Sequence, residues 1–215
     1  MNLIAIRACR MGASAVFLSI FATLSGCALP LPDKPVRPQP YDLGPALPVA
    51  ASAAPTGAPL GLGSVESSAA IDGSNILYRL LYSDGGQQPR PYALARWTMS
   101  PPQLVGQRLR EAFSATRPVV EPSSGLAAIE VRTEMDEFAQ LFESPGASEG
   151  VVRLRVTAIA PTARTSRLLG QRTFTVRKPA PTADAAGGVA ALRAATDEAV
   201  SQVVAWVNAL PAPQR

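Results

Sequence analysis

The sequence predicts an α+β fold, in which a mainly antiparallel sheet carries two amphipathic helices packed on one face. Apolar and polar residues alternate over several segments, which is typical of strands with one buried face. Apolar residues recur every three or four positions over two other segments, which is typical of helices. The connections among the later strands are short, and short connections favour antiparallel pairing.

The predicted folded domain spans residues 60–215 and begins with strands. Residues 60–67 are weakly strand-like, whereas residues 74–82 alternate well and carry apolar residues on both faces. A loop over 84–90 leads to a second strand over 92–98, so these two strands are predicted to form an antiparallel hairpin.

A helix is predicted to begin after Ser100. Ser100 suits the N-cap, the two prolines that follow suit the first helical positions, and Gln103 completes a capping-box pattern. Apolar residues then recur at helical spacing, and the helix is expected to end near Thr116. The charged residues of this stretch are expected mostly on the exposed face, and they are Arg108, Arg110 and Glu111.

Residues 126–136 predict the clearest strand, because apolar residues point one way and charged residues the other. Phe138 is out of phase with this alternation, so a β-bulge or the strand end is expected near Glu137. Strands over 151–160 and 168–178 follow. The arginines of the first are expected to face the acidic row of the preceding strand and to pair with it.

The last predicted element is a long helix over 189–210. Its apolar stripe is formed by Val189, Leu192, Thr196, Ala199, Val203, Trp206 and Leu210. Asp184 precedes this helix, where a negative charge suits the helix dipole, and Pro211 ends it.

The N-terminal residues 1–26 predict a cleavable signal peptide. Two arginines and no acidic residue precede a mostly apolar stretch, as in secretory signals. The run Leu24-Ser25-Gly26-Cys27 resembles the lipobox of bacterial lipoproteins, whose cysteine is acylated and becomes the first residue of the mature chain. This resemblance implies lipidation of Cys27.

Residues 27–59 are predicted to form a tether that begins at the lipidated cysteine. Proline and alanine dominate this segment, so it buries little and tends to an extended polyproline conformation. Residues 41–45 interrupt this composition and indicate a short first strand. In the lipoproteins that the lipobox resembles, an aspartate after the cysteine retains the protein at the inner membrane. Ala28 therefore implies the periplasmic face of the outer membrane.

The composition excludes several kinds of site from the predicted domain. The chain has 20 Lys+Arg, 16 Asp+Glu and no histidine, and the interspersed charges make no case for nucleic-acid binding. Both cysteines precede the domain, and no phosphate loop occurs. Four acidic side chains could suggest a metal site: Glu130, Glu134, Asp136 and Glu137. Nearby arginines favour a solvated face instead. We therefore expect no catalytic residue, no metal and no cofactor.

The order of these motifs resembles the auxiliary lipoproteins of ABC-type transport systems, which are usually encoded beside mammalian-cell-entry (MCE) lipid transporters. The resemblance spans most of 41–210. Besides the lipobox, it rests on Tyr41-Asp42-Leu43, Ile71-Asp72-Gly73, Ile76-Leu77-Tyr78-Arg79, Tyr92, Arg96-Trp97, Pro101-Pro102-Gln103-Leu104 and a terminal helix ending around Trp206.

The resemblance implies a non-enzymatic lipoprotein that assists lipid movement between the two membranes with an MCE-domain protein, a permease and an ATPase. Arg79, Arg96 and Trp97 are candidate partner-binding residues, because interfaces favour arginine and tryptophan. In the alternative interpretation, Trp97 packs beneath a helix while the arginines cover the sheet edge. A second function stays open, namely an outer-membrane assembly or scaffold lipoprotein that binds another envelope complex. A homo-oligomer also stays open, because closed symmetry suits a conduit.

Overall fold

The computed structural model describes residues 36–45, 57–162 and 165–211. The predicted signal peptide, Cys27 and most of the predicted tether lie outside these residues. The helices and strands described below belong to one unit, Arg37–Arg215. No helix within the described ranges is both long enough and apolar enough to cross a membrane.

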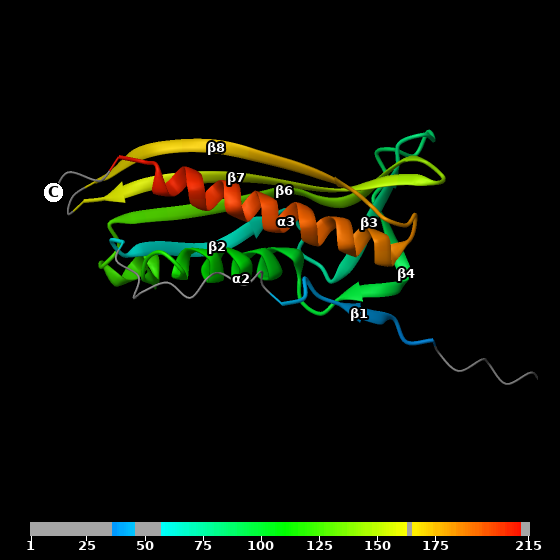
Figure 1. Cartoon of the computed structure of the whole chain (residues 1–215), viewed down its shortest axis with the longest axis horizontal. Coiled ribbons are helices and arrows are strands. Elements are labelled where there is room, and N and C mark those ends of the chain that lie inside the picture. The colour runs from blue at the N-terminus through cyan, green and yellow to red at the C-terminus, as the bar shows by residue number, and fades with distance from the viewer. Residues whose placement is uncertain (1–35, 46–56, 163–164, 212–215) are drawn as a thin grey trace, which may run out of the picture. The chain divides into compact units, whose positions relative to one another are not determined.

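The described residues form one eight-stranded sheet and two α-helices (Figure 1). The strands are β1 (Gln39–Tyr41), β2 (Leu60–Ser67), β3 (Asn75–Leu80), β4 (Arg90–Trp97), β5 (Val119–Val120), β6 (Ile129–Ser144), β7 (Ala147–Pro161) and β8 (Ser166–Pro179). The helices are α2 (Pro101–Ser114) and α3 (Ala185–Asn208), with a short 3-10 helix η1 (Pro122–Ser124). The fold is therefore α+β, as predicted.

The sheet is mixed, so the prediction of a mainly antiparallel sheet is wrong. β6, β7 and β8 pair antiparallel, as do β3 and β4. However, β2 and β3 both pair with β6 in parallel, β5 pairs with β2 in parallel, and β1 pairs with β4 in parallel. Parallel neighbours require long crossovers, and the segment that runs through β4 and α2 provides one between β3 and β6. The short connections of the later strands could not indicate this.

The long strand β6 contains the expected bulge. Its register against β7 shifts between Met135 and Glu137, and Met135 and Phe138 are both buried in the main core. The bulge therefore returns Phe138 to the core face, as its change of phase predicted.

The opposite face of β6 and β7 carries the expected ion pairs. An oxygen of Asp136 lies 2.7 Å from a guanidinium nitrogen of Arg155, and one of Glu134 lies 3.6 Å from the other. Arg153 lies 3.4 Å from Glu137. This face is partly exposed to solvent, so each pair stabilises the sheet by at most ~1 kcal/mol.

Helix α2 begins after the predicted cap Ser100, whereas α3 begins at Ala185, before the predicted Val189, with Asp184 as its N-cap. The Ser100 backbone amide donates to the Gln103 side chain at 3.2 Å before α2. Asp184 Oδ1 accepts a hydrogen bond from the Gly187 amide at 2.8 Å in the first turn of α3. This hydrogen bond is the main reason why the pKa of Asp184 lies below its ordinary value.

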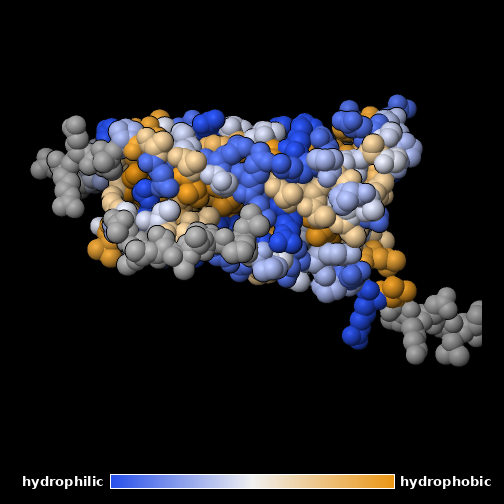
Figure 2. Space-filling model, in the orientation of Figure 1, coloured by the Kyte–Doolittle hydropathy of each residue, from blue (hydrophilic) through white to orange (hydrophobic). Residues whose placement is uncertain are grey.

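Helix α3 lies along β6, β7 and β8, whereas α2 contacts β2, and the two helices contact each other (Figure 1). Buried residues of both helices and of these strands belong to one hydrophobic cluster. Gly150 of β7 allows the close approach of α3, because a Cβ there would stand 2.6 Å from the Leu192 backbone nitrogen. On the face that carries α3, hydrophilic and hydrophobic residues are interspersed (Figure 2).

Candidate functional site

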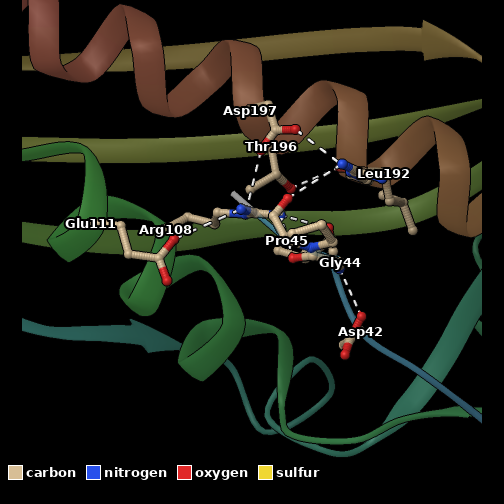
Figure 3. Close-up of polar contacts among 10 residues, drawn as sticks. Asp42, Gly44, Pro45, Arg108, Glu111, Leu192, Thr196 and Asp197 are labelled. Carbon is tan, nitrogen blue, oxygen red and sulfur yellow. Dashed lines mark hydrogen bonds and ion pairs between the residues drawn. The ribbon is translucent and has the colours of Figure 1, made fainter. Parts of the chain in front are cut away.

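A buried arginine binds the chain segment that follows β1. Arg108 of α2 is 6% exposed, although it is charged. Its Nη2 donates to the carbonyl oxygens of Leu43 at 2.5 Å, Gly44 at 2.8 Å and Pro45 at 3.2 Å (Figure 3). Because the acceptors are backbone oxygens, this recognition depends on the path of the segment rather than on its side chains.

The path of this segment is set locally. Asp42 Oδ1 accepts a hydrogen bond from the Gly44 amide at 2.7 Å, which closes a tight turn (Figure 3). Gly44 has a φ of 65°, a left-handed conformation that glycine adopts without steric cost. Leu43 is 3% exposed and belongs to the main core. The turn therefore buries one apolar side chain and directs three carbonyl groups at Arg108.

Acidic side chains balance the buried charge of Arg108. Asp197 of α3 lies 3.4 Å from Nε, and Glu111 lies 3.7 Å from Nη1. Arg193 of α3 donates to the Pro45 carbonyl at 3.3 Å and lies 3.9 Å from Asp197. We call these contacting residues the Arg108 cluster: Leu43, Gly44, Pro45, Arg108, Glu111, Arg193 and Asp197. The cluster joins α2, α3 and the segment before residue 46.

The Arg108 cluster is suited to holding chain segments together. An arginine stays protonated at neutral pH, so Arg108 does not serve as a general base. No group of side chains suited to a metal ion occurs within the part of the chain that the structure describes. The cluster fixes the beginning of the folded unit, which is the part nearest in sequence to the predicted anchor.

The three predicted partner-binding residues occupy different environments. Arg79 of β3 donates to the Gln87 carbonyl at 2.8 Å, and Arg96 of β4 donates to Asn75 Oδ1 at 2.5 Å. Trp97 is 3% exposed, and its ring centroid lies 5.6 Å from that of Phe138 in an edge-on arrangement. In this structure the side chain of Trp97 contributes to the core, while Arg96 lies at the surface.

The family model of the ABC-type transport auxiliary lipoprotein component matches residues 41–204. The chain belongs to this family. The match begins in β1, beside the Arg108 cluster, and ends within α3. This family is a component of transport systems and not a class of enzymes.

Solved structures share the fold of this auxiliary lipoprotein. A protein from Xanthomonas campestris has a TM-score of 0.66 at 19% identity, over 79% of this chain and 94% of that one. A further uncharacterised protein has a TM-score of 0.61 at 13% identity, over 80% of this chain and 99% of that one. At these identities the likeness shows the fold alone. No curated protein matched the sequence.

Sequence reasoning missed the central residue of the Arg108 cluster. It expected Arg108 on the exposed face of the auxiliary lipoprotein's first helix, and that expectation is wrong. Arg108 lies four residues after Leu104 and four before Ala112, which places it on the apolar stripe. A charge in phase with the buried residues is the signal that could have identified it.

Proposed function

We propose that this auxiliary lipoprotein is a non-enzymatic periplasmic subunit of an ABC-type, MCE-associated lipid transport system, and that it helps lipid trafficking between the inner and outer membranes. The family match over residues 41–204 carries the proposal. The family supports a role beside an ABC transporter, and the MCE-domain partner and the lipid cargo are our extension of it.

In this proposal the protein is anchored by the lipidated Cys27 to the periplasmic face of the outer membrane. The residues between Cys27 and Arg37 would span about 30 Å in an extended polyproline conformation. The Arg108 cluster supports this arrangement, because it fastens the first residues of the folded unit to both helices. The tether would therefore hold the whole domain within a fixed distance of the membrane.

Replacement of Cys27 by serine in a strain that expresses only this copy tests the role of the anchor. We expect a folded protein with an unchanged melting temperature, loss of membrane fractionation and loss of lipid transport, measured as the phospholipid content of the outer membrane. Ala28→Asp is the matched variant that changes the membrane to which the protein is sorted, and it should move the protein to the inner membrane. Full transport by the Cys27→Ser variant would overturn the proposed role of the anchor.

Capture of the partner tests the transport assignment directly. The mature lipoprotein should retain the MCE-domain protein encoded beside it. Arg96, which is exposed on β4, is proposed to contribute to this contact. Arg96→Ala should therefore reduce capture, whereas Arg132→Ala, at an exposed site on β6, should not. Capture of a different envelope complex in place of the MCE-domain protein would favour the scaffold function.

A further inference from the structure

The edge of β6 is left without a neighbour over a short stretch. β2 pairs with β6 as far as Met135, and β3 begins to pair with it at Gln140. The turn over residues 68–74 connects the two parallel strands across this gap. Between Met135 and Gln140, the backbone of β6 therefore has no strand partner on this edge among the described residues.

A pocket of about 280 Å³ lies at this gap. It is lined by residues of the turn, of β3, of the bulge in β6 and of β7. Its apolar lining includes Ile71, Leu77, Phe138 and Ala139. Leu77 also packs against a small cluster of buried residues that is separate from the main core. Ala139 belongs to this second cluster, which therefore forms part of the apolar wall of the pocket.

Two arginines and two carboxylates line the pocket: Arg79, Arg153, Asp136 and Glu137. Arg153 pairs with Glu137 at 3.4 Å, and Asp136 pairs at 2.7 Å with Arg155, which lies outside the lining and also pairs with Glu134. Arg79 also lines the pocket, and within the described ranges it forms no ion pair.

The carbonyl groups of a neighbouring loop hold Arg79 in place. Its Nη1 donates to the Gln87 oxygen at 2.8 Å and to the Gly86 oxygen at 3.5 Å. Its Nε and Nη2 have no hydrogen-bond partner among the described residues. A guanidinium with one side fixed can offer the other as a fork, which matches the oxygens of a phosphate.

We propose that this pocket binds the phosphate group of an anionic amphiphile, with Arg79 on the phosphate and the apolar wall on the first methylene groups of the chain. This inference rests on the proposed function and names the cargo's headgroup chemistry. The volume is close to the lower end of ligand pockets, ~300 Å³, so it accommodates a headgroup and the start of a chain rather than a whole lipid.

Titration of the purified mature lipoprotein in a neutral detergent with hexyl phosphate tests the site, with backbone NMR shifts as the readout. We expect saturable shifts over residues 136–139. Arg79→Gln should weaken hexyl phosphate binding about tenfold or more, because it removes a charge-assisted contact. Arg132→Gln removes a charge from the neighbouring strand β6 outside the pocket and should leave the affinity unchanged.

Inorganic phosphate and hexanol serve as comparison ligands that distinguish a lipid headgroup from free phosphate. Tighter binding of hexyl phosphate than of either probe supports a lipid headgroup, and Ile71→Ser should remove the advantage over inorganic phosphate. Equal affinity for inorganic and hexyl phosphate would overturn the lipid assignment in favour of free phosphate. Equal affinity of Arg79→Gln and the unchanged protein for hexyl phosphate would overturn the site itself.

The binding assay is independent of the transport proposal. It uses the purified protein alone, whereas the proposed function is tested by capture of the MCE-domain protein. Absent hexyl phosphate binding with intact capture overturns only the pocket. Lost capture with retained binding overturns only the transport role.

Discussion

Replacement of Arg108 by methionine tests whether the Arg108 cluster holds the segment 42–45 on the helices. Methionine keeps an unbranched apolar stem but removes every donor, so the carbonyl groups of Leu43, Gly44 and Pro45 lose their bonds to Arg108. Removing one partner of a buried charged set costs about 3–5 kcal/mol. Glu111 is largely exposed and Asp197 keeps its contact with Arg193, so we expect the lower value.

A loss of about 3 kcal/mol lowers the melting temperature of a domain of this size by roughly 6–12 °C. Urea unfolding of the mature protein gives the free energy of unfolding, and hydrogen exchange reports on the segment itself. The Thr98 amide donates to the Tyr41 carbonyl at 2.8 Å, so its protection should fall when the segment is released.

Arg110→Met is the matched control on the same helix. Arg110 and its partner Glu121 are both exposed, with a separation of 3.5 Å, so this change should cost less than about 1 kcal/mol. The reasoning is refuted if Arg108→Met and Arg110→Met unfold at the same urea concentration and the Thr98 amide keeps its protection.

Three further predictions concern the sheet and α3. Gly150→Ala should destabilise the protein by about 3 kcal/mol in urea unfolding because its Cβ would meet the backbone of α3, whereas Gly146→Ala, with nothing within 4 Å, should change the free energy of unfolding by less than about 1 kcal/mol. Burial raises the pKa of Tyr92 to about 12 in the folded protein, so the unfolded state loses this proton first as pH rises. The free energy of unfolding should therefore fall between about pH 10 and 12. Tyr92→Phe should remove this fall in unfolding curves measured at alkaline pH. The pKa of Asp184 is lowered in the folded protein, so its ionised carboxylate stabilises the fold above the ordinary aspartate pKa of about 4. This stabilisation is lost as pH falls through the folded pKa. The difference in melting temperature between Asp184→Ala and the unchanged protein should therefore shrink in acid.

Features that depend on neighbouring residues could be predicted from the sequence. Ser100 and Gln103 form the capping interaction because both lie within one helical turn. The phase change at Phe138 indicated the bulge because successive side chains in a strand point to opposite faces. Asp184 precedes α3 as expected, although the helix begins at Ala185 and not at Val189.

Features that depend on distant segments could not be predicted in this way. No local pattern indicates that Leu60 and Tyr78 lie beside the same strand. The parallel pairing of β2 and β3 with β6, and the gap between them, could therefore not be predicted. The pocket at Arg79 exists only because two strands end and begin there. The helical phase of Arg108 indicates its burial, but its acceptors could not be predicted because they are backbone carbonyl groups more than 60 positions away, which every residue carries.

The shared edge of β6 has a consequence for the order of folding. β2 and β3 pair with residues roughly 60 to 70 positions further along the chain, whereas β6, β7 and β8 are joined by short turns and make local contacts. In the proposed export behind an N-terminal signal peptide, β2 and β3 would emerge before β6. Until β6 emerges, β2 lacks its β6 partner and β3 is paired with β4 on one edge only, and unpaired strand edges favour aggregation. Once β6 to β8 have paired, the edge of β6 becomes the template on which the earlier strands assemble.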